Sequence, residues 1–183
     1  MEYYGAGAYL MVKKITVFFI LFYSCFVNAQ ISLSMNRNLW QENVAVSYND
    51  TKNYQLTTFS SWSFGAGYDF YITKRYIYAP SIEYHFGDAD VHKIDETLIS
   101  PRKKFSAIWF NNPIIYRVTK TFNIGLSSTF NYRSGDGLGK VLSAGLIFLT
   151  EYELFDDVML NQNIGTFGNS NQISYSVGLS RVF

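Results

Sequence analysis

Apolar and polar residues alternate along most of the chain after residue 30. Around residues 63–72 the apolar positions are Phe64, Ala66, Tyr68, Phe70 and Ile72, and mostly small or polar residues stand between them. The same alternation recurs over 76–86, 122–133 and 173–183. A period of two puts successive side chains on opposite faces of a β-strand. The pattern therefore predicts strands with one apolar and one polar face.

The breaks in this alternation predict about eight antiparallel strands in an all-β barrel. We expect strands over 31–38, 56–73, 76–87, 104–118, 121–133, 138–150, 156–166 and 171–183. The connections are then 39–55, 74–75, 88–103, 119–120, 134–137, 151–155 and 167–170. Long polar connections alternating with short turns are typical of an up-and-down membrane barrel with both termini in the periplasm. We also expect a bulge around Asn111–Pro113 and an Asp-Gly turn at Asp136.

The composition of the two faces indicates which one meets lipid. The polar face consists mostly of Ser, Gly, Thr and Asn, which suit a narrow lumen, whereas the apolar face is rich in large aromatic residues. Bulky apolar residues suit a lipid-facing belt. Trp40, Trp62, Trp109, Tyr76, Tyr78, Tyr116 and Tyr132 fall near predicted strand ends, where aromatic girdles are expected. The alternative is a soluble barrel with the faces reversed, which would bind an apolar ligand.

Composition and charge narrow the function classes. Aromatic residues make up 19% of the 183 residues, with 15 Tyr and 16 Phe, which favours strands. The formal net charge is only +1, so we expect no nucleic-acid partner. The single cysteine, Cys25, lies in the N-terminal apolar run, so no disulfide is expected to hold the exported domain.

The N-terminus has the features of an export signal. Lys13 and Lys14 precede an apolar run, Ile15–Phe26, that is too short to span a bilayer as a helix. We expect a signal peptide within residues 1–29, cleavage after Ala29, and a barrel domain over 30–183. We expect residues 1–10 to be an upstream extension, because Met11 stands where such a signal would begin, with Met1 as the alternative start. Lipidation at Cys25 is a weaker alternative.

The export signal, the alternation and the C-terminal segment resemble those of small Gram-negative outer-membrane barrels. The resemblance is to the OmpA-like membrane domain and its eight-stranded relatives, and it covers residues 30–183. It implies that Tyr175, Val177, Leu179 and Phe183 form the signal read by the barrel-assembly machinery, from which Arg181 departs. It also implies an outer-membrane location, with outer-membrane lipid and lipopolysaccharide as partners. The signal ending Asn28-Ala29-Gln30 resembles those of Bacteroidetes-type bacteria.

Charged residues on the polar face are the main candidates for chemistry. Asp69, Glu83, His85 and Arg133, with Glu151, are expected to point into the lumen. We expect a salt-bridged plug, because eight strands leave room for little more than side chains. The alternatives are a gated polar pathway or an active site. Ser81, Glu83 and His85 share a face but stand too far apart along one strand for a nucleophile–base pair.

Other polar clusters carry weaker signals. His85 and His92 are the only histidines, and with Asp88 and Asp90 they would make a poor metal site, so no metal or other cofactor is expected. The basic run Arg102–Lys104 is a candidate contact for lipopolysaccharide phosphates. The sequence thus predicts a non-enzymatic envelope protein that is structural or presents the loops 39–55 and 88–103. The alternatives are a lipid A acyl hydrolase-like enzyme and the soluble ligand-binding barrel.

Overall fold

The computed structural model describes residues 29–48, 51–92, 102–135, 137–167 and 173–183, with the backbone alone for 44–48, 51–55 and 92. The described strands are β1 (Ala29–Tyr48), β2 (Thr51–Tyr71), β3 (Tyr76–Tyr78), β4 (Ser81–His92), β5 (Lys103–Arg117), β6 (Phe122–Gly135), β7 (Gly139–Phe155), β8 (Val158–Phe167) and β9 (Ile173–Val182). None of the described residues forms a helix long and apolar enough to cross a membrane. The predicted signal peptide lies outside the described residues except for Ala29, which begins β1.

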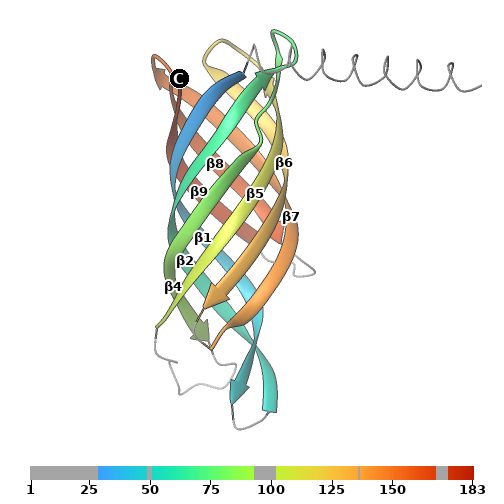
Figure 1. Ribbon diagram of the computed structural model, residues 1–183, viewed down its shortest axis with the longest axis vertical. Coiled ribbons are helices and arrows are strands. Elements are labelled where there is room, and N and C mark those ends of the chain that lie inside the picture. Colours follow the sequence, from blue (N-terminus) through green and yellow to red (C-terminus); the bar gives the residue numbers. More distant parts are fainter. Residues whose placement is uncertain (1–28, 49–50, 93–101, 136, 168–172) are drawn as a thin grey trace, which may run out of the picture.

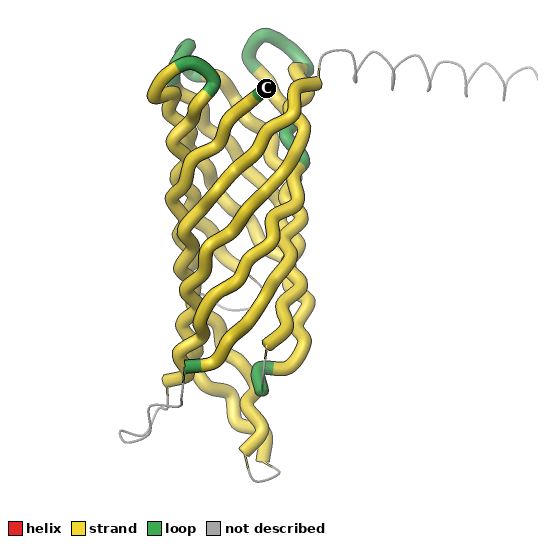
Figure 2. The backbone as a smooth tube through the Cα atoms, turned by 60° about the vertical axis from the view of Figure 1, so that its left-hand side comes forward, coloured by secondary structure: helices red, strands yellow, loops and turns green. Residues whose placement is uncertain are grey.

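The sheet closes on itself as an antiparallel barrel (Figure 1). β1 pairs with β2 from Ala29 opposite Phe70, and with β9 from Ser32 opposite Val182. β3 and β4 both pair with β2 and β5, so they are two parts of one barrel strand and the ring has eight strands. The tube view shows the strands tilted steeply around the barrel axis (Figure 2). The predicted up-and-down barrel of about eight strands is confirmed.

Pro80 separates β3 from β4. Proline has no N–H for the ladder, but its carbonyl accepts a hydrogen bond from Tyr68 N at 3.1 Å, and the register on both sides is unbroken. The bulge expected at Asn111–Pro113 is wrong, since β5 keeps its register with β6 through these residues. The register shift among the described strands lies between β7 and β8, at Glu153/Phe155.

The first connection differs from the prediction. Residues 39–48 and 51–55 were expected in a loop, but they extend β1 and β2 into a long hairpin that reaches beyond the neighbouring strands (Figure 1). A strand pair is held by backbone hydrogen bonds, so polar side chains do not prevent it once the chain has left the lipid. Likewise β4 continues to His92, which leaves 93–102 as the third connection, mostly outside the described residues.

The β6–β7 hairpin turns at two glycines, while Asp136, on which the Asp-Gly turn was predicted, lies outside the described residues. Gly137 and Gly139 both have φ of 67°, a left-handed conformation that glycine adopts at little cost. Leu138 N donates to Gly135 O at 3.1 Å, and the Leu138 side chain turns back into the barrel, where it is buried. The turn therefore contributes a side chain to the barrel interior.

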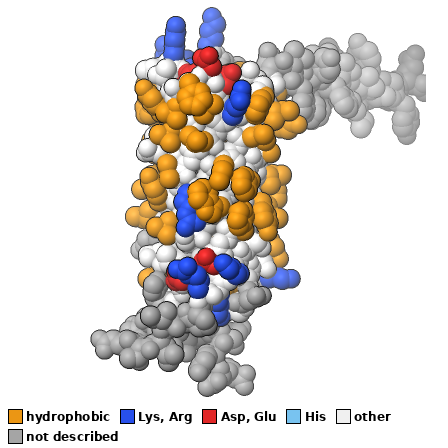
Figure 3. Space-filling model, turned by 90° about the vertical axis from the view of Figure 1, so that its left-hand side faces the viewer, with side chains coloured by type: hydrophobic (Ala, Val, Ile, Leu, Met, Phe, Trp, Pro, Cys, Tyr) orange, Lys and Arg blue, Asp and Glu red, His pale blue; other side chains and the backbone are white. Residues whose placement is uncertain are grey.

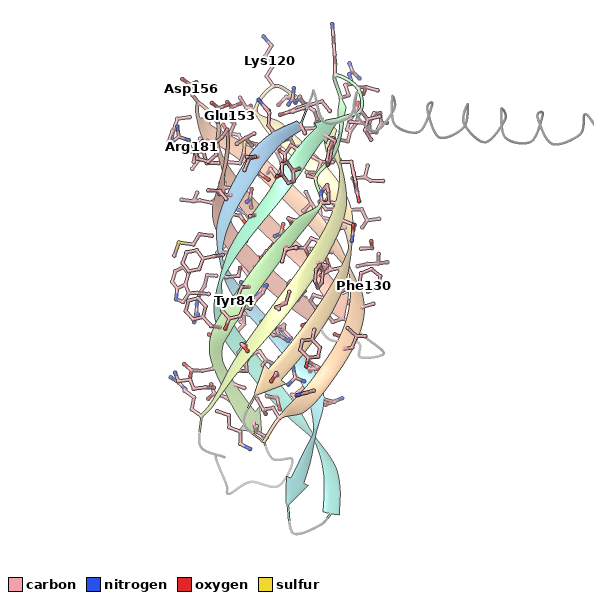
Figure 4. All side chains as sticks on the ribbon, viewed as in Figure 1. Tyr84, Lys120, Phe130, Glu153, Asp156 and Arg181 are labelled. Carbon is pink, nitrogen blue, oxygen red and sulfur yellow. The ribbon has the colours of Figure 1, made fainter. Side chains whose placement is uncertain are left out.

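The exterior is apolar over a wide band. On β6, Leu126 and Phe130 are 55% and 50% exposed, whereas Thr129 and Asn131 between and beside them are buried. Figure 4 shows Tyr84 and Phe130 pointing away from the barrel at mid-height. In Figure 3 the hydrophobic side chains form a band with most charges gathered at its two ends. The predicted assignment of the apolar face to lipid is confirmed, and the soluble barrel with reversed faces is wrong.

Candidate functional site

The lumen is divided into a packed half and a hollow half. The packed half, here called the aromatic plug, lies toward the loop end, opposite the chain termini. Its buried members are Trp40, Phe59, Ala89, Val91, Phe105, Ala107, Trp109, Leu138, Ile147 and Phe167. Trp40 stacks on Phe59 with ring centroids 5.0 Å apart, and Phe105 meets both rings edge-on. Such aromatic packing fills the narrow interior of an eight-stranded ring.

Arg133 is buried in the plug. Its Nη2 lies 3.3 Å from Glu42 Oε1, and its guanidinium lies 4.5 Å from the centroid of the Phe59 ring. The side chain of Arg133 is fully buried, so its charge depends on these two contacts. The Nε and Nη1 atoms of Arg133 have no hydrogen-bond partner among the described residues. This ion pair ties β6 to β1 across the barrel.

His85 lies between a serine and a carboxylate at the boundary of the two halves. Ser61 Oγ is 3.3 Å from His85 Nδ1, and Glu83 Oε2 is 3.5 Å from His85 Nε2. This is a Ser–His–Glu arrangement assembled from two strands, which reasoning along a single strand missed. Ser61 and His85 are fully buried, and neither lines the cavity. A nucleophile must be reached by its substrate, and in this structure Ser61 is closed off from the cavity.

Glu83 is held by a set of neutral donors. Its carboxylate accepts hydrogen bonds from Asn111 Nδ2 at 2.8 Å, Ser63 Oγ at 2.9 Å and Asn36 Nδ2 at 3.3 Å. Glu83 and its three donors lie on four different strands, β4, β5, β2 and β1. The stagger of neighbouring strands brings them to the same level along the barrel axis. These three donors give the largely buried Glu83 side chain hydrogen-bond partners on both of its oxygens.

The half of the lumen toward the termini contains a cavity of about 200 Å³. Exposed Gln30, Lys120 and Asp157 line its mouth, while buried Asn38 and Trp109 line its inner end. Lys120 and Glu153 lie at this end of the barrel in Figure 4. The expected salt-bridged plug is thus wrong in two respects. The plug is aromatic, and the charged residues mostly line a hollow.

The sequence-predicted lumen residues all face inward but do not form one network. Glu83 and His85 lie together at the plug boundary, Arg133 is paired with Glu42 inside the plug, and Asp69 lines the cavity. Glu151 also lines the cavity, where it accepts a hydrogen bond from Asn123 Nδ2 at 3.0 Å. No described group of three or more His, Cys, Asp or Glu side chains is arranged to hold a metal ion.

The closed sheet and its apolar exterior identify a membrane-spanning β-barrel of the outer-membrane type. No protein-family model and no curated protein matches the chain. Among solved structures, Neisserial surface protein A has 14% sequence identity and a TM-score of 0.44, covering 85% of this chain and 97% of that one. Ail, the attachment invasion locus protein of Yersinia pestis, has 8% identity and a TM-score of 0.46, with the same coverage. A de novo designed transmembrane β-barrel has 8% identity and a TM-score of 0.47, covering 84% of this chain and 95% of that one.

The aromatic girdle was predicted only in part. Trp62 and Tyr76 are on the exterior, 44% and 46% exposed, whereas Trp40 and Trp109 lie inside the aromatic plug. The inward direction of the two buried tryptophans could have been read from the alternation, because residues two positions apart on a strand share a face. Trp40 shares a face with Asn38, and Trp109 shares a face with Asn111. Side-chain parity therefore outweighs the general preference of tryptophan for membrane interfaces.

Charged residues at the loop end form ion pairs on the outer surface. Lys104 Nζ lies 2.6 Å from Asp88 Oδ1, and Arg102 Nε lies 3.3 Å from Asp90 Oδ1. Asp88 and Asp90 were expected in a loop but belong to β4, and the side chain of His92 lies outside the described ones. The pairing neutralises much of the basic run that was considered for phosphate contacts.

The C-terminal strand presents its apolar residues to lipid. Tyr175, Leu179 and Phe183 are 47%, 48% and 61% exposed, and Val177 is half-buried. Phe183 N donates to Ile31 O at 2.8 Å, so the last residue is still tied to β1. The Arg181 guanidinium lies 5.0 Å from the Phe183 ring centroid at the terminus rim. The assembly-signal role of these residues stays a prediction.

Proposed function

We propose that the chain is a non-enzymatic outer-membrane protein with a closed lumen and a structural or loop-mediated interaction role at the cell envelope. The aromatic plug carries this proposal. Trp40, Phe59 and Phe105 fill the lumen near the loop end, and Trp40 and Phe59 are 2% and 0% exposed. A path for solutes would require these rings to leave packed positions, which costs several kcal/mol per aromatic side chain.

The burial around His85 supports a non-enzymatic role. A lipid A acyl hydrolase-like enzyme would need a nucleophile open to lipid at the outer rim. Ser61, the serine beside His85, is instead fully buried. We therefore favour the envelope role over the enzyme, which remains the alternative that activity measurements would test.

The β1–β2 hairpin supports the interaction role. It extends beyond the neighbouring strands β9 and β4 at the loop end (Figure 1). We propose that this end faces outward, with the termini in the periplasm, so that the hairpin is presented to an external partner. An OmpA-like superfamily membership and a Bacteroidetes-type source belong to the same proposal.

Conductance and lipid analysis test the proposal together. Protein extracted from the outer-membrane fraction is added to planar bilayers in concentrated potassium chloride, and lipid A from expressing cells is analysed by mass spectrometry. We expect no stable conductance steps and no change in lipid A acylation. Steady single-channel conductance would contradict the closed lumen. Loss of an acyl chain that depends on Ser61 or His85 would establish the enzyme instead.

A further inference from the structure

The outer surface of the barrel changes from apolar to polar along one row of residues near the loop end. Ser60, Asp88 and Lys104 lie opposite one another on β2, β4 and β5. Two positions nearer the termini, Trp62 and Phe86 are outward-facing apolar residues, 44% and 41% exposed. Figure 3 shows charged side chains gathered at this end of the hydrophobic band. The row therefore marks the edge of the lipid-facing band, where the headgroups of the lipids meet the protein.

Arg37 is a cation on the lipid-facing surface beside this row. It is exposed, and its neighbours on the same face of β1, Met35 and Leu39, are apolar and 43% and 50% exposed. Its guanidinium carbon lies 5.4 Å from the centroid of the Trp62 ring, and its Nη2 donates a hydrogen bond to Ser60 Oγ. Arg37 forms no ion pair with any described carboxylate. A cation among lipid-facing apolar residues is costly unless an anion accompanies it, so Arg37 marks a position for an anionic group.

Two further cations give this edge of the band a surplus of positive charge. Lys104 Nζ lies 2.6 Å from Asp88 Oδ1, and Arg102 Nε lies 3.3 Å from Asp90 Oδ1. Asp88 is also within electrostatic reach of Arg37 and Arg102, so the three cations lie around it. Three cations against two carboxylates leave one positive charge. The side chains of Lys104 and Arg102 are 79% and 67% exposed, and each has donors left for a second anionic partner.

We propose that the phosphate group of a lipid headgroup binds at the edge formed by Arg37, Arg102 and Lys104. A guanidinium binds phosphate through parallel charge-assisted hydrogen bonds, and Ser60 occupies one nitrogen of Arg37. The exposed Leu39 beside Arg37 contacts the acyl chains of the same lipid, a contact that a free phosphate ion does not make. The choice of an outer-leaflet lipid rests on the proposed function, in which the loop end faces outward.

Retention of lipid by the folded barrel tests this site. The purified protein in uncharged detergent micelles is mixed with lipid A or with the same lipid without its phosphate groups, and bound lipid is counted by native mass spectrometry. Inorganic phosphate is added as a competitor. We expect saturable retention of lipid A, little retention of the dephosphorylated lipid and no displacement by an equal concentration of inorganic phosphate. Equal retention of the two lipids would overturn the phosphate site, and displacement by inorganic phosphate would overturn a lipid as its ligand.

Matched variants separate this site from general surface charge. Arg37→Gln removes the cation beside the row, while Arg181→Gln removes an exposed cation at the terminus rim. Losing one charge-assisted contact is expected to weaken lipid A binding about tenfold, and Arg181→Gln is expected to leave it unchanged. Heat-modifiable migration on gels confirms folding independently, and Lys104→Gln replaces Arg37→Gln if the latter does not fold. Equal weakening by Arg181→Gln would overturn the proposal. Conductance and lipid A acylation are separate measurements, so this failure is distinguishable from a failure of the proposed function.

Discussion

The indole ring of Trp109 lies against the imidazole of His85, with ring centroids 4.0 Å apart and planes inclined by 29°. Trp109 also contacts Trp40 and Phe167, with centroid distances of 5.4 and 4.7 Å. One side chain of β5 thus touches β1, β4 and β8. Because these contacts cross the lumen, Trp109 joins the wall of the barrel to its filling and forms the floor of the cavity.

Removing Trp109 is expected to destabilise the barrel by about 3 kcal/mol, since a buried tryptophan leaves a void that neighbouring rings fill incompletely. Trp62→Ala is the control, because Trp62 faces outward and lipid or detergent takes its place. Denaturant unfolding in micelles, followed by heat-modifiable gel migration, measures both variants. Equal losses for Trp109→Ala and Trp62→Ala would argue against a specific role for the plug.

The Arg133–Glu42 pair predicts a non-additive effect. Glu42→Leu leaves the buried guanidinium with the Phe59 ring and no carboxylate, and is expected to cost about 3 kcal/mol. The double variant Glu42→Leu with Arg133→Met removes both charges and is expected to recover most of that loss. The unfolding free energies of the unaltered protein, Glu42→Leu, Arg133→Met and the double variant form a double-mutant cycle. Additive losses would mean that the two side chains act independently.

The lipid-facing band predicts a dependence on depth. Phe130→Arg puts a charge at mid-height of the band and is expected to cost about 2–4 kcal/mol. Tyr152→Arg puts the same charge near the terminus end, opposite Phe122, and is expected to cost about 0–1 kcal/mol. Reversible unfolding in phospholipid vesicles measures both. Similar costs at the two positions would contradict the assignment of the band to the bilayer interior.

The proposed assembly signal separates folding in cells from folding in vitro. Deleting Phe183 removes an exposed side chain and one hydrogen bond to Ile31, so refolding into detergent is expected to be nearly unchanged. In cells we expect a several-fold drop in the heat-modifiable form recovered from the outer membrane. Phe155→Ala, which changes a residue of 65% exposure elsewhere, is the control. If Phe183 deletion and Phe155→Ala reduce assembly alike, Phe183 carries no specific signal.

The alternation of apolar and polar residues was sufficient to predict the barrel and to predict which face of its strands meets lipid. Each strand must place one face toward lipid, and a shift by one residue would invert both faces. Polar composition was a poorer guide, since Gln41–Tyr48 continues β1 outside the apolar band. Strand pairing depends on backbone hydrogen bonds. The alternation of residues indicates only whether side chains face lipid or the lumen, so it does not show where pairing ends. Loop lengths were therefore overestimated wherever strands extend past the lipid.

The arrangement inside the lumen could not be predicted from single strands. Ser61 meets His85, and Glu42 meets Arg133, only because the stagger of the ring brings distant residues to one level. The division into a filled and a hollow half depends on how large side chains from several strands meet. Trp40 and Phe59 come from β1 and β2, which pair directly, whereas Phe105 and Trp109 come from β5, which β4 separates from β2. Their shared parity was overlooked for Trp40 and Trp109, which were expected in the girdle, and parity alone does not show that the four rings gather at one end.

A lumen with a floor exchanges with a single compartment. Whatever reaches Trp109 from the terminus end must return by the same mouth, so no net flow can pass and no gradient across the membrane can drive one while the plug holds. The occupancy of the cavity by any solute therefore depends only on the solute concentration at the terminus end. It is independent of the concentration on the other side of the membrane.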